Sequence, residues 1–172
     1  KPVRLTEQCG EVTVVVNPPF PPATVEDADD VYDLPFNYAP HPRYGKKGAI
    51  PAWEMIKFSV NIHRGCFGGC SFCAIAAHQG KFISSRSERS VMSEVEKISR
   101  MEGFKGYLSD LGGPSANMYR MAGRDRNRCL KCGRPSCIWP SVCDNLETSH
   151  SDLTELYRRV NALPYIKKAF VG

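Results

Sequence analysis

Long hydrophobic runs are missing from this 172-residue sequence, in which no uninterrupted apolar stretch approaches the roughly 18 residues that a membrane-spanning helix needs. This absence excludes membrane insertion. Repeats with a solenoid period and low-complexity tracts are also missing, which excludes repeat architectures. The sequence has no signal-peptide pattern, so we expect a cytoplasmic protein. Because it begins with Lys1 rather than Met, we expect an excised fragment of a longer chain.

A large charge of one sign is missing as well. The sequence has 23 Lys and Arg against 18 Asp and Glu, and its net charge of +5 is too small for a protein coated by nucleic acid over its whole surface. The excess lies in a basic segment, residues 120–134, in which Asp125 is the only acid. Such a segment can face a substrate anion, a nucleic-acid phosphate or the negative charge of metal-bound thiolates. Its basic residues are Arg120, Arg124, Arg126, Arg128, Lys131 and Arg134.

Cysteine, by contrast, is abundant, with eight residues. The chain is larger than the usual disulfide-rich secreted domain and has no export signal, so the spacing favours metal ligation over disulfides. Cys9 stands apart, and we expect a buried or unreactive thiol there. The three-cysteine loop consists of Cys66, Cys70 and Cys73. The four-cysteine group consists of Cys129, Cys132, Cys137 and Cys143.

The first 50 residues predict one strand and a proline-rich connection. VTVVV at residues 12–16 has the β-branched composition of a buried strand. Residues 18–51 contain most of the prolines, few periodic apolar positions and an acidic patch. These features predict a long irregular connection or surface wrap.

Two further strands and two helices follow before the chain reaches its last residues. Alternation in KFSVNI predicts a strand at residues 57–62, and a second strand is expected at residues 106–113. Helical spacing predicts a helix at residues 91–102, with Ser90 as its N-cap. A second helical face lies between Leu153 and Leu163.

The end of the sequence completes the pattern. Ser149 and Asp152 have the spacing of a capping box for the second helix, and a third strand is expected at residues 169–171. The alternation of strands and helices predicts an α/β fold with parallel strands, joined by right-handed crossovers, and sites in the loops at the strands' carboxyl ends. A cysteine-rich insertion interrupts this pattern at about residues 114–148.

The three-cysteine loop has the chemistry of an iron-sulfur site. Three closely spaced thiolates can hold three irons of a cubane cluster and leave the fourth iron open to an external ligand. A structural zinc ion needs four protein ligands, so it would require His63, His78 or a distant cysteine in addition. Phe72 supplies a flat apolar surface within the loop.

The loop sequence RGCFGGCSFC resembles the CxxxCxφC signature of radical SAM enzymes, with Phe72 at the aromatic position. The wider stretch IPAWEMIKFSVNIHRGCFGGCSFCAIAAHQGKFISSRS, together with RCLKCGRPSCIWPSVCDNLETSH, is similar to the YgiQ family of uncharacterised radical SAM proteins, over about residues 40–172. The resemblance implies that residues 51–172 form the N-terminal part of a radical SAM core, a partial (β/α) barrel. It assigns the ligands of a 4Fe-4S cluster to Cys66, Cys70 and Cys73.

The resemblance also implies an activity. In radical SAM enzymes the open iron binds S-adenosylmethionine, and one electron then cleaves it to methionine and a 5'-deoxyadenosyl radical. An electron donor such as flavodoxin or ferredoxin is therefore an expected partner. The substrate stays open, and RNA is one option because ISSRS resembles an element of radical SAM methylthiotransferases.

Three residues outside the loop resemble cofactor-binding positions. Gly112 and Gly113 occupy the place of two glycines near the cofactor's amino group, although Pro114 replaces the acid often found there. The alternative for these glycines is an ordinary turn. Arg86 either binds the cofactor carboxylate or is solvated.

The four-cysteine group leaves its metal open. Its four thiolates can close a structural zinc site or hold an auxiliary iron-sulfur cluster. The basic segment offsets the charge of such a centre, or it binds a phosphorylated or nucleic-acid substrate with Tyr119 or Trp139 stacked on a base. The competing function is thus a zinc-stabilised nucleic-acid-binding module in which both cysteine groups are structural.

Overall fold

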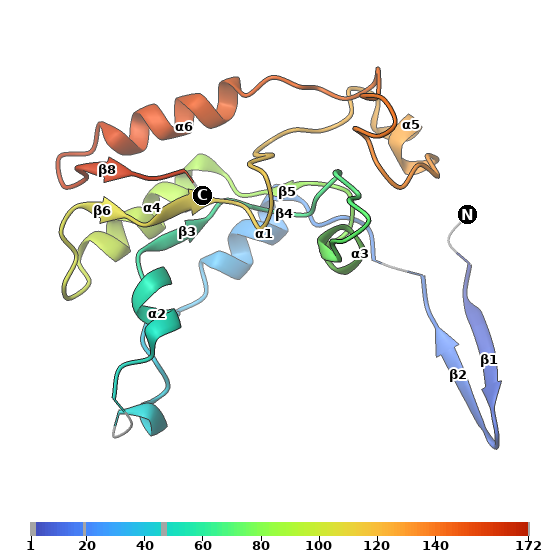
Figure 1. The fold of residues 1–172 in the computed structure, drawn as a ribbon, viewed down its shortest axis with the longest axis horizontal. Helices are drawn as coiled ribbons and strands as arrows, with labels where there is room; N and C mark the ends of the chain where they lie inside the picture. Colours follow the sequence, from blue (N-terminus) through green and yellow to red (C-terminus); the bar gives the residue numbers. More distant parts are fainter. Residues whose placement is uncertain (1–2, 19, 46–47, 172) are drawn as a thin grey trace.

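Parallel strands form the centre of the protein in a computed structural model (Figure 1). Strand β3 (Ser59–Asn61) pairs with β7 (Asp110–Gly112), and β6 (Tyr107–Leu108) pairs with β8 (Lys168–Ala169). Because only Ser109 separates β6 from β7, this stretch lies between β3 and β8 and runs parallel to both. The structure describes residues 3–18, 20–45 and 48–171. Lys1, on which the expectation of an excised fragment rests, lies outside these residues.

Backbone hydrogen bonds join the central stretch to both neighbours. Ser109 N donates to Phe58 O at 3.0 Å, and Leu111 N donates to Phe170 O at 3.0 Å. The fold is therefore a mixed α/β arrangement with small parallel sheets, as the alternation of elements predicts. The strands are shorter than the predicted segments, and a break at Ser109 divides the second one.

Helices α4 (Glu88–Ser99) and α6 (Ser151–Asn161) bury their apolar faces against these strands. Helix α4 contacts β3 and α6, and α6 also contacts β8. This packing holds the strand ends in place through burial of apolar surface. The buried core consists of Val60, Ile62, Val91, Val95, Ile98, Leu108, Leu111, Tyr119, Leu156, Val160, Ile166 and Ala169.

Both predicted helix caps are wrong in detail. Helix α4 begins at Glu88, and its N-cap is Ser87, whose Oγ accepts a hydrogen bond from Ser90 N at 3.1 Å. Helix α6 has His150 as its N-cap, with no side-chain cap bond. Ser149 stands one residue before that cap and accepts from Ser151 N at 3.2 Å instead, so the predicted capping box does not form.

The N-terminal residues form an antiparallel hairpin rather than a buried strand. Strand β1 (Leu5–Cys9) pairs with β2 (Val12–Val16) across a turn in which Gly10 has φ +61°. Every residue of both strands is exposed, and the hairpin projects away from the rest of the chain (Figure 1). The expectation of a buried strand is therefore wrong. Cys9 is exposed on β1. Of the two alternatives for its thiol, buried or unreactive, the buried one is therefore wrong.

The predicted irregular connection contains a helix, α1 (Val25–Tyr32). A capping box starts it: Asp27 N donates to Thr24 Oγ1, and Thr24 N donates to the Asp27 carboxylate. Further along α1, the buried Asp29 carboxylate accepts from Ser87 N at 2.9 Å, which fastens α1 to the start of α4. The acidic patch therefore has a structural role in capping and docking.

The remaining elements are short. No helix within the described parts of the chain is long and apolar enough to cross a membrane. The short elements are η1 (Pro42–Tyr44), α2 (Pro51–Ile56), β4 (His63–Arg64), α3 (Ile75–Gln79), β5 (Ser84–Ser85) and α5 (Arg126–Leu130).

Candidate functional site

The three-cysteine loop begins directly after β4 and is fastened at its base. Cys66 N donates to Gly80 O at 3.0 Å, which closes the loop around α3. Gly65 has φ +91°, and a Cβ there would lie 2.0 Å from Phe82 O, so only glycine fits this approach. The Cys66 side chain is buried, whereas Cys70 is exposed. The loop therefore has one anchored thiol and one that faces solvent.

Two thiols of the loop lie over Gly68. A Cβ added to Gly68 would stand 3.3 Å from Cys66 Sγ and 3.7 Å from Cys70 Sγ, so both sulfurs lie close to the same side of Gly68. Gly68 N also donates to Cys66 Sγ at 3.4 Å. The two sulfurs and this backbone amide therefore lie together on one side of the loop.

The donor set fits a cubane cluster in particular. All three cysteines of the loop are free thiols. Among the described residues, no three His, Cys, Asp or Glu side chains converge as closely as a single metal ion requires. In a cubane, each thiolate binds a different iron, so three sulfurs can hold it without meeting at one point.

The aromatic residue of the loop faces outward. The Phe72 side chain is 92% exposed. The neighbouring Phe67 is buried instead, in a cluster that we name the loop cluster. Phe67 therefore provides the apolar surface on the buried side of the loop, next to Cys66, and a contact of Phe72 with an inorganic group stays a prediction. The loop cluster contains Cys66, Phe67, Met118, Met121 and Leu146, with Ile75, Ile83, Cys137 and Cys143 packed against it.

The two glycines at the carboxyl end of β7 are closely packed, and the second of them makes room for a buried histidine. A Cβ on Gly113 would lie 2.0 Å from His63 Nε2. That nitrogen accepts a hydrogen bond from Met118 N at 3.0 Å, and Gly113 N donates to Asn117 Oδ1 at 3.1 Å. Gly112 is also confined, because a Cβ there would be 2.8 Å from Asp110 Oδ1. The pair therefore has a packing role beyond an ordinary turn, and a contact with a cofactor stays a prediction.

His63 makes this region sensitive to acid. Burial lowers the pKa of His63 to about 4 from its ordinary value of 6.5, and a hydrogen bond with the Arg64 backbone opposes this shift. As the pH falls, the unfolded chain binds a proton near 6.5 but the folded chain does not until about 4. The stability that neutral His63 contributes is therefore complete above pH 6.5 and is lost as the pH falls towards 4.

We expect the wild-type protein to lose about 3 kcal/mol of stability across this window, and His63→Gln to lose much less. Hydrogen exchange of the Met118 amide between pH 7 and pH 4.5 measures the local opening that the histidine controls. Parallel pH profiles in the two proteins would contradict the assignment.

The solvated alternative for Arg86 is wrong. Its side chain is 1% exposed and forms an ion pair with Glu94. Its guanidinium also donates to Asn61 O at 2.8 Å and lies 3.9 Å from the centre of the Tyr32 ring. These contacts use the guanidinium within the protein, so the structure assigns Arg86 a structural role. The preceding Ser84 and Ser85 form β5, which pairs with β4 beside the start of the three-cysteine loop.

The insertion places the four-cysteine group beside the three-cysteine loop. An antiparallel bridge between Gly123 and Leu146 closes its base. All four thiols line one cavity of about 780 Å³, which Phe67 of the three-cysteine loop also lines. The amide N–H of Arg134, with a smaller effect of Lys81, lowers the pKa of the Cys132 thiol. Burial raises the pKa of Cys137.

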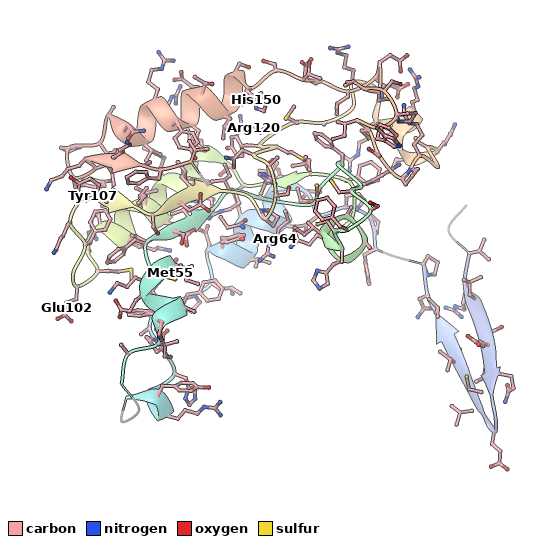
Figure 2. The ribbon with its side chains drawn as sticks, in the orientation of Figure 1. Met55, Arg64, Glu102, Tyr107, Arg120 and His150 are labelled. Atoms are coloured by element: carbon pink, nitrogen blue, oxygen red, sulfur yellow. The ribbon has the colours of Figure 1, made fainter. Side chains whose placement is uncertain are left out.

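Much of the basic segment is paired with acids. Arg124 contacts Glu147 at 3.3 Å and Arg128 contacts Asp144 at 2.9 Å. Arg120 lies below the amino-terminal end of α6, where His150 is labelled (Figure 2), and contacts Asp152 there at 3.8 Å. These ion pairs offset part of the positive charge. Tyr119 is buried, so it is not available to stack on a base, whereas Trp139 is exposed.

Comparisons with known proteins show which proteins this chain resembles. A family model described as Radical SAM N-terminal matches residues 1–59. UPF0313 proteins of Bacteroides thetaiotaomicron and Porphyromonas gingivalis are each 59% identical to this chain over 98% of its length. A UPF0313 protein of Rhodopseudomonas palustris is 53% identical over 98% of the chain. This chain belongs to the UPF0313 family. No solved structure matches it.

The UPF0313 proteins extend well beyond the present chain, which spans 27%, 26% and 25% of the three relatives. The model match covers the hairpin, α1 and α2, and ends within β3, before the three-cysteine loop. The matched segment includes α1, whose Asp29 carboxylate accepts a hydrogen bond from Ser87 N at the start of α4.

Several residues that position the cysteines of this UPF0313 protein could not be recognised from the sequence. The sequence indicates His63 only as an additional zinc ligand, although it stands three residues before Cys66. Asn117, which accepts from the nearby Gly113 N, belongs to no recognisable motif. Ser136 and Asn145 form no pattern either, because their roles depend on hydrogen bonds to residues further away in the chain. Lys81 follows the loop directly, and only the fold shows that it reaches the insertion.

Proposed function

We propose that this chain contributes the cluster-binding part of a radical SAM enzyme, in which the three-cysteine loop holds a 4Fe-4S cluster. The observation that supports this most directly is that two thiols of a CxxxCxxC loop, those of Cys66 and Cys70, lie together beside Gly68 in a chain with a Radical SAM N-terminal match. When bound, the cluster supplies one electron to the sulfonium of S-adenosylmethionine, which yields methionine and a 5'-deoxyadenosyl radical.

The residues of this chain would hold the cluster and shield it from water. Cys66 anchors the cluster on its buried side, where Phe67 and the other apolar side chains of the loop cluster exclude water. Cys70 and Cys73 bind at the more open side. We expect an electron donor such as flavodoxin or ferredoxin to approach from this exposed side.

The parallel strands support a partial (β/α) barrel as the scaffold. Chain order runs from β3 through α4 to β6 and β7, and then through α6 to β8, as in a barrel built from strand and helix units. Gly112 and Gly113 follow at the carboxyl end of β7, and Ile62 N donates to Gly112 O at 2.9 Å. We propose that this glycine pair faces the cofactor's amino group.

Anaerobic reconstitution of the full-length protein tests the proposal. We expect about four irons and four sulfides bound by the three-cysteine loop, and a reduced electron-spin signal that changes when S-adenosylmethionine is added. Stoichiometric zinc at these three thiols, with no response to the cofactor, would overturn it.

The nucleic-acid-binding module has less support. Three arginines of the basic segment form ion pairs within the insertion or with α6, which lowers the charge available for phosphates. RNA as a substrate of the enzyme stays a separate proposal. Unchanged RNA modification in a deletion strain would count against it.

A further inference from the structure

The four-cysteine group lies in a segment with almost no hydrophobic core of its own. Between residues 126 and 143, which contain all four cysteines, the large apolar side chains are exposed: Leu130 is 56% exposed, Trp139 75% and Val142 58%. Its only helix, α5, has five residues. A segment of this kind gains too little from apolar burial to fix its loops, so another interaction must hold them together.

The four thiols lie where such an interaction can form. Cys129, at the end of α5, shares the cavity of about 780 Å³ with the three other cysteines of the group. Cys143 N donates to Cys137 O at 2.8 Å, which brings the last two cysteines together across their loop. None of the four forms a disulfide. The group therefore offers four free cysteines that line the same cavity.

A buried asparagine and a glycine position one of these sulfurs. Asn145 Nδ2 donates to Cys129 Sγ at 3.1 Å, and Asn145 Oδ1 accepts from Asp125 N at 2.9 Å, which fixes the amide. A Cβ on Gly123 would stand 2.2 Å from the same sulfur, so only glycine leaves room for it. A buried amide aimed at sulfur is typical of the hydrogen bonds that support metal-bound thiolates.

Two cations beside the cavity have no carboxylate partner among the described residues. Lys81 Nζ donates to Cys132 O and Arg134 O at 3.0 Å each. Arg134 donates to Trp139 O and Ser141 O. Carbonyl groups are neutral, so both positive charges remain available to offset the excess negative charge of a metal bound by four thiolates.

We propose that the four-cysteine group is a second metal centre, in which all four thiolates close around one thiophilic group, a zinc ion or an iron-sulfur cluster, from positions in the described structure that do not yet converge as a single ion requires. The centre is distinct from the cluster of the three-cysteine loop and does not depend on that cluster. It holds the insertion in its folded form, as structural metals do in small segments that lack a core.

The second centre also supports the first loop, because the two are in direct contact. Cys137 N donates to Phe67 O at 2.9 Å, and Ser136 Oγ donates to Gly68 O at 2.7 Å. Gly69 packs against Pro135 so closely that a Cβ would lie 2.5 Å from its carbonyl oxygen. Loss of the second metal therefore loosens the backbone that positions Cys66 and Cys70.

The test uses full-length protein purified without oxygen, in a background in which Cys66, Cys70 and Cys73 are alanine. This background removes the first cluster, so the result does not depend on the proposed radical chemistry. We expect about one zinc, or about four irons with sulfide, to be bound in the background and lost when Cys132→Ser and Cys143→Ser are added. Cys9→Ser is the matched control and should retain the metal.

Two readouts identify the metal. Co²⁺ added to the metal-stripped protein gives thiolate-to-cobalt charge-transfer absorption at a zinc-type site, whereas a cluster gives an electron-spin signal after reduction. Equal metal content with and without the two serine substitutions would overturn the proposal.

If the serine variants do not fold, the rate at which the cysteines of the wild-type protein are alkylated tests the proposal instead. We expect the four-cysteine group to react at least about tenfold more slowly than Cys9 until a chelator or acid removes the metal. Reaction of these four thiols as fast as Cys9 in the native protein would also overturn the proposal.

Discussion

Replacing Cys70 by alanine in the full-length protein is expected to abolish reductive cleavage of S-adenosylmethionine. The exposed Cys70 thiol lies beside Gly68 together with the Cys66 thiol, and its loss leaves the proposed cubane one ligand short. We expect production of 5'-deoxyadenosine to fall by more than about a hundredfold, since metal-ligand loss removes the group that performs the chemistry. Chromatographic assay of 5'-deoxyadenosine, with dithionite as the electron source, measures it.

Cys9→Ala provides the matched control for this experiment. Both cysteines are exposed, but Cys9 lies on the N-terminal hairpin. Its replacement should leave both iron content and product formation unchanged. Normal turnover by the Cys70 variant would show that this cysteine is not a cluster ligand.

The largest effect on stability is expected from Glu94→Ala. Glu94 is 8% exposed and pairs with Arg86, which is 1% exposed, so the substitution leaves a buried guanidinium without its carboxylate. Removing one partner of a buried ion pair costs about 3 to 5 kcal/mol. Hydrogen exchange of the α4 amides and urea denaturation should both report the loss.

The same helix contains a control pair. Glu96 and Arg100 form an exposed ion pair on α4, and Glu96→Ala should cost only about 0.5 kcal/mol. In the double variant Arg86→Met with Glu94→Leu, apolar packing replaces the charges, and we expect most of the stability to return. Equal losses for Glu94→Ala and Glu96→Ala would mean that the buried pair contributes little.

The sequence was informative where local patterns decide structure. The strand period in KFSVNI and the helical spacing that starts at Val91 reflect burial on one face, and both elements lie close to their predicted places. Cysteine spacing distinguished the two groups because the ligands of a compact site often lie close together in the sequence. The parallel pairing followed from the order of these elements.

The sequence did not predict burial or contacts that depend on residues far apart in the chain. A β-branched run suggested burial for Val12–Val16, but burial depends on whether another layer covers the strand. Arginine is usually a surface residue, and Arg86 is buried here because it forms an ion pair with Glu94 of α4. Contact between the two cysteine groups depends on bonds such as Ser136 to Gly68, 68 residues apart.

The N-terminal hairpin has a practical consequence for handling this protein. Its two strands have open edges, and valine side chains are exposed along β2. Unprotected ribbons of this kind pair readily with further copies of themselves. Shortened preparations that leave the ribbon uncovered should therefore aggregate through it before the rest of the molecule melts, and a lysine at Val14 or Val16 would act as a gatekeeper.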